Sequence, residues 1–416
     1  MERSLQKDRH HLAAWFVWIA AVVFYLYEYL ARVAPSVMEQ DLEEAFHTSS
    51  VALASALGAY YFIYSPIQLL AGALFDQFGG KRVLVPASLF VVLGCLLVSL
   101  PSANLGLLAV GRVFMGLGSG FGFIGVMYLA AVWFNAKKLA LISGLTTSLG
   151  ICGALIGQVP LSQLTDAVGW RTAWIYIALV GILSALVLIF FVRETPIWER
   201  ENVADKGEGF SVKEFLAGLL CVCKNVQTWI IGFVACTLYT PLVVFGDLWG
   251  VQYVRLVADV SKAKAACIVG MLYIGWLVGG PLVGYISDSV RCRRNLLRIS
   301  CLSATIILAA IFLCAVKSPP LLGVLLFACG VASSPQVVCF VASLEANPSF
   351  AKGSAISVVN MIVMLFGGIF QPIVGWLMHS NNASYDVDSF RFALLLLPVL
   401  TLAGFFAASF MAKREN

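Results

Sequence analysis

Charged side chains are scarce in this chain of 416 residues. Asp, Glu, Lys and Arg make up 12% of the sequence and hydrophobic residues 60%, whereas a soluble domain has about 25% charged residues. The hydrophobic residues are spread along the whole chain, and its mean hydropathy is +0.91. This composition excludes a soluble domain with a single anchor and is typical of a polytopic membrane protein.

Motifs that carry chemistry are also missing. The sequence has no Gly-x-x-x-x-Gly-Lys-Ser/Thr loop, so ATP is not expected to drive the protein directly. The four histidines lie in tails or at the ends of apolar segments, and none belongs to a His-Glu-x-x-His metal motif. Neither a nucleophile–base pair within the apolar segments nor a basic tract for nucleic acid is apparent. We therefore expect no enzyme activity, no cofactor, no bound metal and no nucleic-acid partner.

Apolar segments long enough to cross a membrane recur along the chain. A helix needs about 20 apolar residues to span the hydrocarbon core. We count twelve such segments, at 12–36, 49–75, 82–100, 105–134, 139–163, 172–192, 228–254, 265–288, 297–316, 319–346, 353–378 and 390–411. The predicted fold class is an all-α polytopic membrane protein with twelve transmembrane helices.

Lys and Arg residues are distributed unequally between the two sides of this predicted bundle. Nineteen of the 27 lie in the tails and in the loops on their side, six lie on the other side, and Arg32 and Arg112 lie within spans. Because basic loops stay in the cytoplasm, we expect both termini to be cytoplasmic. Short loops throughout favour a bacterial inner (cytoplasmic) membrane.

The chain divides into two similar halves at its longest polar stretch. We predict an N-terminal six-helix bundle over 1–192, a cytoplasmic linker over 193–224 with an interfacial helix, and a C-terminal bundle over 225–416. Asp76 and Asp288 each follow a Gly by four positions and precede basic residues, and they are 212 positions apart. The same offset relates Gly118 to Gly330, and 213 positions separate Gln158 from Gln371. Such repeats place a substrate site near the midplane, between the halves.

The first repeated segment resembles a family signature. Gly72-x-Leu74-x-Asp76-x-x-Gly79-x-Lys81-Arg82 is similar to the cytoplasmic signature of the major facilitator superfamily, and Arg112-x-x-x-Gly116-x-x-x-Gly120 to its fourth-span motif. The resemblance implies a secondary transporter built from two bundles related by pseudo-two-fold symmetry. Gln77 and Gly80 depart from the signature, which usually has basic residues there. The fifth-span motif of antiporters is poorly formed, which disfavours drug–proton antiport.

The signature also implies residues that gate the inner face. Asp76 lies at a helix end, where a carboxylate can accept hydrogen bonds from backbone amides. The alternative is a simple turn that carries a positive-inside marker. The gating residues implied by the signature and by its repeat are Gly72, Asp76, Gly79, Lys81, Arg82, Asp288 and Arg291. Glu345, near the cytoplasmic end of the tenth span, is interpreted as an inner gate or cap.

Charges within the first span are unexpected, because each costs about 2.5–3.5 kcal/mol at mid-membrane. Tyr25, Glu28, Tyr29 and Arg32 follow helical spacing, so they share one face, which must point into the bundle. Arg112 in the fourth span lies at a similar depth, and we expect Glu28 to lie between Arg32 and Arg112. One interpretation is a structural ion-pair cluster. The other is that Arg32 binds an anionic solute group while Glu28 exchanges a proton and Arg112 tunes it.

The seventh span supplies polar residues for the opposite wall. Tyr239, Asp247 and Trp249 interrupt its apolar run, and the repeat places Asp247 at a depth comparable to Arg32. The segment around Arg32 resembles the first-span arginine of the sugar-phosphate permease branch, which implies a second arginine in the seventh span. This chain has Asp247 there instead, which favours a zwitterion over a dianion. Alternatively, Asp247 lies near the outer end and is merely solvated.

Further polar residues fall in spans that we expect to face a central cavity. Amides and aromatic hydroxyls orient small polar ligands, but they also bond neighbouring helices or anchor at the interface. The additional candidates for solute contact are Tyr128, Gln158, Tyr273, Gln336, Asn360 and Gln371.

Together these features predict a transporter that rocks two bundles around a central site. The expected cargo is a small zwitterionic or anionic solute such as an amino acid, a short peptide or an organic anion, imported with protons by a monomer. Two alternatives remain open. The chain could export drugs or siderophore-like metabolites, or it could be a solute sensor that keeps the carrier fold without transport.

Overall fold

The computed structural model describes residues 2–134, 136–193, 212–290, 293–380 and 386–412, and the secondary structure of these residues is helical. Twelve helices in them are long and apolar enough to cross a membrane. The predicted all-helical, twelve-span fold is thus confirmed. The spans are Leu12–Val37, Ser50–Phe75, Gly80–Ser99, Leu105–Trp133, Leu145–Val168, Trp170–Phe191, Val226–Ala258, Lys262–Val283, Arg293–Leu313, Pro319–Ala346, Lys352–Met378 and Val387–Ala408.

The first half of the chain provides six spans and a short helix outside them. Its elements are α1 (Glu2–Val33), the 3₁₀ helix η1 (Ala34–Val37), α2 (Glu39–Phe46), α3 (Ser50–Phe78), α4 (Gly80–Ser99), α5 (Leu105–Ser119), α6 (Gly122–Trp133), α7 (Ala136–Ile156), α8 (Val159–Val168) and α9 (Trp170–Phe191). Side-chain caps fix two of the starts, since Ser49 accepts from Ala52 N and Asn104 from Leu107 N.

The predicted linker contributes α10 (Val212–Lys224), which overlaps the predicted interfacial helix and packs against α17 of the second half. The elements after it are α11 (Val226–Thr240), the π-helical η3 (Pro241–Trp249), α12 (Gly250–Ala258), α13 (Lys262–Val290), α14 (Arg293–Leu313), α15 (Pro319–Ser333), α16 (Gln336–Ala346), η4 (Ser349–Ala351), α17 (Lys352–Ser380), α18 (Val387–Leu394) and α19 (Leu396–Ala408).

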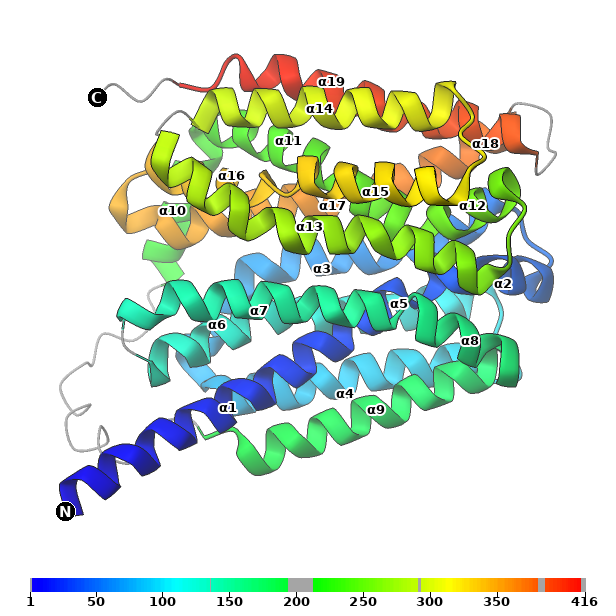
Figure 1. The fold of residues 1–416 in the computed structure, drawn as a ribbon. Coiled ribbons are helices and arrows are strands. Elements are labelled where there is room, and N and C mark those ends of the chain that lie inside the picture. The colour runs from blue at the N-terminus through cyan, green and yellow to red at the C-terminus, as the bar shows by residue number, and fades with distance from the viewer. Residues whose placement is uncertain (1, 135, 194–211, 291–292, 381–385, 413–416) are drawn as a thin grey trace.

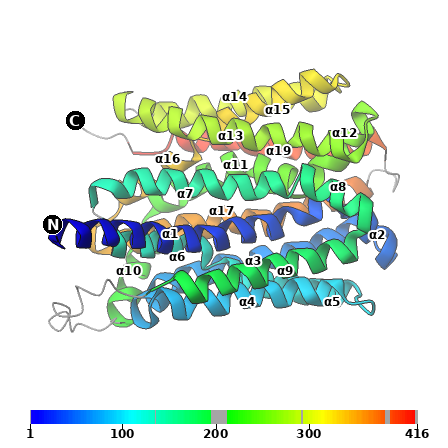
Figure 2. The ribbon, with the colours of Figure 1, turned by 60° about the horizontal axis from the view of Figure 1, so that its bottom comes forward.

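The two halves of the chain lie side by side, and the axes of their helices are roughly aligned. In Figure 1, α4 and α9 lie along the bottom, α14 and α19 along the top, and α3, α7, α13 and α17 between them. The inner helices make the junction, where α3 packs on α17 and α7 on α13. The start of α1 and the end of α19 lie at one side, at the left in Figures 1 and 2. We call this side the terminal face, and the side of α2, α8 and α12 the distal face.

Several spans are broken, and proline or glycine lies at the breaks described next. The fourth, fifth and tenth spans each consist of two helices, joined at Gly120–Phe121, Gly157–Gln158 and Ser334–Pro335. The seventh span is α-helical at both ends and π-helical over the nine residues of η3. Pro241 at the start of η3 has no N–H to donate. Runs of π-helix are rare and are often found at functional sites.

Close contacts between helices correct one part of the predicted repeat. A Cβ atom at Gly330 would lie 2.0 Å from Leu272 O, and one at Gly116 would lie 2.3 Å from Tyr60 O. Leu272 and Tyr60 are 212 positions apart, so Gly116 is the counterpart of Gly330 by contact. The expected counterpart, Gly118, instead faces Ala87 O of α4. The register between the fourth and tenth spans is shifted by two residues, which sequence offset alone could not reveal.

Candidate functional site

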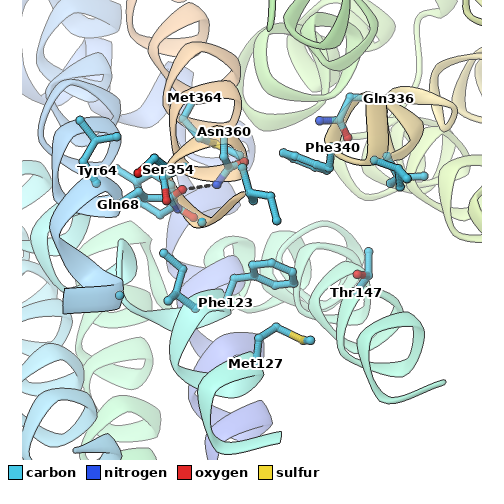
Figure 3. Close-up of a pocket in the computed structure, with 18 of the residues that line it drawn as sticks. Tyr64, Gln68, Phe123, Met127, Thr147, Gln336, Phe340, Ser354, Asn360 and Met364 are labelled. Atoms are coloured by element: carbon cyan, nitrogen blue, oxygen red, sulfur yellow. Dashed lines mark hydrogen bonds between the residues drawn. The ribbon is translucent and has the colours of Figure 1, made fainter. Parts of the chain in front are cut away.

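A cavity of about 870 Å³ lies between the two halves of the chain. Its lining includes Gly72 of α3, Gly218 of α10 and Gly353 of α17, which lie toward the terminal face. At its other end it is lined by Tyr25, Tyr29 and Tyr239. Figure 3 shows the cavity between the α3 and α17 walls and the α6, α7 and α16 helices, with Gln68, Asn360, Phe123, Thr147, Gln336 and Phe340 around it.

Only some of the predicted solute contacts line this cavity. Tyr25, Tyr29, Tyr239, Gln336 and Asn360 do, and so does Gly72 from the signature. Arg32, Asp247, Tyr273, Gln158, Gln371, Trp249 and Tyr128 are not part of its lining.

Sequence reasoning missed two polar residues of α3 that line the cavity. Tyr64 and Gln68 follow Tyr61 by three and seven positions, so the three share one face of the helix. This polar stripe in an otherwise apolar span was a signal that could have found them.

Beyond the tyrosine end of the cavity lies a buried ion pair. The Arg32 Nε atom is 3.6 Å from Asp247 Oδ2, and the two side chains are 1% and 2% exposed. The Arg32 guanidinium stacks 3.6 Å from the centre of the Tyr29 ring, and NH2 donates to the Tyr239 hydroxyl at 3.5 Å. The expectation that Arg32 and Asp247 share a depth is therefore confirmed, and the alternative of a solvated Asp247 is wrong.

Asp247 is also held by two tyrosines from different halves of the chain. Tyr61 of α3 donates to Oδ2 at 2.8 Å, and Tyr273 of α13 donates to Oδ1 at 2.7 Å. Both carboxylate oxygens are thus satisfied, as a buried charge requires. Arg32 and Tyr61 belong to the first half and Asp247 and Tyr273 to the second, so this cluster ties the halves together.

Glu28 forms no ion pair with Arg32 or Arg112, although it is close enough to Arg32 for their charges to interact, so its position between the two arginines stays a prediction. Glu28 is fully buried and its Oε2 accepts a hydrogen bond of 3.1 Å from the Tyr60 hydroxyl. Its Oε1 has no hydrogen-bond partner among the described residues, and no ion pair of Glu28 is found in that part of the chain. A buried carboxyl with one unsatisfied oxygen is a candidate proton-binding group.

Arg112 does not reach Glu28 because backbone carbonyls take up its guanidinium. Nε donates to Leu57 O at 3.2 Å and NH1 to Ala31 O at 3.3 Å. The guanidinium also lies 4.6 Å from the centre of the Tyr60 ring, and Tyr60 in turn bonds Glu28. Arg112 therefore joins α5 to α1 and α3, and Tyr60 contacts both Arg112 and Glu28.

The two glutamines related by the repeat both hold the π-helix η3. Gln158 Nε2 donates to Gly246 O at 3.2 Å and to Ser36 Oγ at 3.2 Å, and Gln371 Nε2 donates to Val243 O at 2.7 Å. Trp249 Nε1 donates to Gln371 O at 3.1 Å. Both glutamine side chains therefore bond the backbone that precedes Asp247 in η3, and neither lines the cavity.

Ion pairs and a hydrogen bond connect the two halves at the distal face. Lys262 Nζ lies 2.9 Å from Asp41 Oδ2 and 3.2 Å from Asp166 Oδ1. Arg255 NH1 donates to Gln40 Oε1 at 2.9 Å. Together with the Arg32–Asp247 pair, these contacts bridge the halves on the side away from the cavity mouth.

The predicted gating residues are described only in part. Gly79 ends α3 with φ of +82°, a conformation that suits glycine, and Lys81 donates to Ile189 O. Arg82 is exposed. The side chains of Asp76 and Asp288 and the whole of Arg291 lie outside the described part of the chain. Glu345 pairs with Arg293 of α14 at 2.7 Å, so this contact stays within the second half of the chain. Tyr128 stacks on Phe75 with ring centres 5.3 Å apart.

Comparisons with known proteins agree with this architecture. The family model described as Major Facilitator Superfamily matches residues 17–372. A probable sulfoacetate transporter of Cupriavidus necator is 24% identical over 284 residues, which cover 67% of this chain and 66% of that protein. A hexuronate transporter of Bacillus subtilis is 24% identical over 66% of this chain and 64% of its own length. These alignments span slightly less than two thirds of either relative.

A phosphoglycerate transporter protein of Salmonella typhimurium aligns over more of the chain. It is 23% identical over 401 residues, covering 85% of this chain and 82% of its own. Among solved structures, a bacterial homologue of the lysosomal transporter Spinster, in an inward-facing and unoccupied conformation, matches with a TM-score of 0.72. It is 16% identical and the match covers 95% of this chain and 97% of that one. A D-xylose–proton symporter matches with the same TM-score, 18% identity and coverage of 96% and 98%.

Proposed function

The chain belongs to the major facilitator superfamily of secondary transporters, and from this premise we propose that it carries a small organic anion or zwitterion by alternating access. The observation that carries the proposal is Arg32, a buried cation beneath the tyrosines at the closed end of the cavity. A fixed positive charge in a desolvated site attracts a carboxylate, sulfonate or phosphate. The cargoes named for the sulfoacetate, hexuronate and phosphoglycerate relatives are all anions.

Binding would proceed by exchange of anions on Arg32. In this conformation Asp247 neutralises the guanidinium, at 3.6 Å. A solute anion that enters past Tyr29 and Tyr239 competes with Asp247 for Arg32. When the anion binds, it breaks the Arg32–Asp247 ion pair that connects the two halves. Substrate binding and opening of the distal face are then linked, because a ligand shifts a conformational equilibrium by its differential affinity for the two states.

We further propose that Glu28 is the proton-coupling group and that transport is import. Its Oε1 has no partner among the described residues, and Tyr60 connects its other oxygen to Arg112. With the termini in the cytoplasm of a bacterial inner membrane, the cavity of this conformation opens inward. The gating roles of the signature residues and the division into bundles at 1–192 and 225–416 belong to the same proposal.

Ligand binding to purified protein tests the anion proposal. The panel comprises sulfoacetate, galacturonate, 3-phosphoglycerate, amino acids, dipeptides and lipophilic cations. Each is measured by thermal shift with the wild type, with Arg32→Gln and with the control Arg171→Gln, since Arg171 is a half-buried arginine of α9 outside the cavity lining. A ligand that binds the native state raises the melting temperature by mass action. We expect an anionic or zwitterionic ligand to stabilise the wild type and Arg171→Gln but not Arg32→Gln. Stabilisation by lipophilic cations alone, in all three proteins, would overturn the proposal in favour of an exporter.

Transport in proteoliposomes tests the coupling proposal. With the stabilising anion as cargo, Glu28→Gln should retain exchange of solute across the membrane but lose accumulation driven by a pH gradient. Wild-type accumulation in the Glu28→Gln protein would exclude Glu28 as the coupling group. Binding without either exchange or accumulation, in the wild type as well, would indicate a sensor.

A further inference from the structure

Two amide side chains from opposite halves of the chain meet at the wall of the cavity. Asn360 Nδ2 of α17 donates to Gln68 Oε1 of α3, and both residues line the cavity. Figure 3 shows this hydrogen bond between the α3 and α17 walls. Gln68 is 1% exposed, so its amide group is almost completely removed from solvent.

The Gln68 amide has a donor that is left over. Its Oε1 is used by Asn360, whereas Nε2 has no partner within hydrogen-bond geometry among the described residues. The neighbouring Tyr64 hydroxyl interacts with the Gln68 amide but lies outside hydrogen-bond geometry to Nε2. Leaving a buried donor without a partner is unfavourable, so such a group at a cavity wall is suited to a ligand that supplies an acceptor.

The position of Gln68 relative to Arg32 defines a distance along the cavity. Tyr61, on the same face of α3, bonds the Asp247 carboxylate that neutralises Arg32. Gln68 follows Tyr61 by seven residues, which is two turns and about 10 Å along the helix. Between these levels Tyr64 completes the stripe. A single solute of five or six carbons could therefore contact the arginine at one end and the amides near the other.

We propose that Gln68 and Asn360 form a neutral subsite that selects hydroxylated organic anions. The inference rests on the proposed function, since it assumes that Arg32 holds the anionic group. The amides carry no charge, so they do not favour a second anionic group. Their donors and acceptors match hydroxyl or carbonyl groups, and an unsubstituted alkyl chain would leave Nε2 without a partner. Because the pair spans both halves of the chain, a bound hydroxyl contacts both walls at once.

Two six-carbon monocarboxylates, galacturonate with hydroxyl groups and hexanoate without them, test the subsite. Equilibrium binding to the purified wild type, Gln68→Met, Gln77→Met and Arg32→Gln is measured by calorimetry against empty detergent micelles. Gln77 is an exposed residue of the same helix outside the cavity lining, so it is the matched control. We expect the wild type to bind galacturonate more tightly than hexanoate. Gln68→Met should weaken the binding of galacturonate by about tenfold, which is the cost of one buried hydrogen bond. It should leave the affinity for hexanoate unchanged.

The possible outcomes separate the two proposals. Equal weakening of both probes by Gln68→Met would mean that Gln68 only supports packing, and an unchanged galacturonate affinity would remove it from the site; either overturns the subsite. If Arg32→Gln weakens the binding of both probes and Gln77→Met binds them as the wild type does, the anion site is upheld independently of these results. If neither galacturonate nor hexanoate binds to the wild type, both the anion site at this position and the subsite that depends on it are overturned.

Discussion

Asp247 of η3 lies 3.6 Å from Arg32 of α1, and this buried ion pair joins the two halves of the chain at the closed end of the cavity. Each partner is surrounded by tyrosines, so the pair has hydrogen bonds as well as charge complementarity. The same pair that closes the cavity holds the cation to which a solute anion would bind. Binding and gating thus meet at one contact.

Removing one member of this pair should destabilise the protein strongly. Asp247→Asn leaves the Arg32 charge buried without a counter-ion, which costs about 3–5 kcal/mol when a buried pair is broken. We expect a clearly lower melting temperature for Asp247→Asn and a partial recovery in the double variant Arg32→Met/Asp247→Leu, which has no buried charge there. Melting curves of the detergent-purified proteins check this. A single variant as stable as the wild type would show that water reaches Arg32.

The Lys262 contacts should hold the distal face closed. Lys262 pairs with Asp41 and Asp166, whose side chains are 41% and 51% exposed, so each pair contributes about 0.2–1 kcal/mol. We expect Lys262→Gln to shift the population severalfold toward a distally open state. The measurement is labelling of Val37→Cys by an impermeant maleimide, in a background with Cys267 and Cys314 replaced by Ser. Val37 is buried in η1, which packs against η3.

Lys264→Gln provides the control for this experiment, since Lys264 is an exposed neighbour on the same helix. Its labelling rate should equal that of the parent. If Lys262→Gln also labels at the parent rate, the pairs with Asp41 and Asp166 do not restrain the distal face.

Glu39 should make the closed distal face sensitive to pH. It begins α2, outside the membrane spans, is 3% exposed, and neither carboxylate oxygen has a partner among the described residues. Burial raises the pKa of Glu39 well above its ordinary value, Glu43 raises it further and Arg255 lowers it. The carboxyl is therefore protonated more readily here than in the unfolded chain.

The sign of the pH effect follows from this raised pKa. The contribution of Glu39 to the stability of the fold is complete below the ordinary glutamate pKa of about 4.3. It is lost as the pH rises through the raised pKa of the folded state. Between about pH 5 and about pH 8 the melting temperature should fall less in Glu39→Gln than in the wild type, because glutamine stays neutral. Glu44→Gln, at an exposed position of the same helix, should keep the wild-type slope. An unchanged slope in Glu39→Gln would assign the pH dependence to other groups.

Gly330 should be intolerant of even one methyl group. A Cβ there would lie 2.0 Å from Leu272 O, a backbone atom of α13 that cannot move alone. We expect Gly330→Ala to destabilise the protein by about 1–3 kcal/mol through overpacking. Gly280→Ala, in α13 with no atom within 4 Å of the added Cβ, should be neutral or stabilising by up to about 1 kcal/mol. Thermal melting of both variants makes the comparison, and equal stability would contradict the close packing of α13 and α15.

Sequence alone determined the membrane class, the twelve spans and the repeat, because the hydrophobic length of a span and the spacing of a motif are local properties. It also singled out Arg32, since a charge inside a span is too costly without a partner. The depth of Asp247 followed from the repeat. The repeat did not predict the direction of each side chain, because residues at one depth can point to different neighbours.

Tertiary structure decided which of those neighbours were used. Arg112 lies at the depth expected for contact with Glu28, but the carbonyls of Leu57 and Ala31 occupy its guanidinium instead. Gln158 and Gln371 bond the irregular backbone of η3, which no periodic pattern predicts. Gln68 and Asn360 meet only because α3 and α17, from opposite halves, pack together. Such contacts depend on how helices distant in sequence are placed in space, so only the folded chain defines the site.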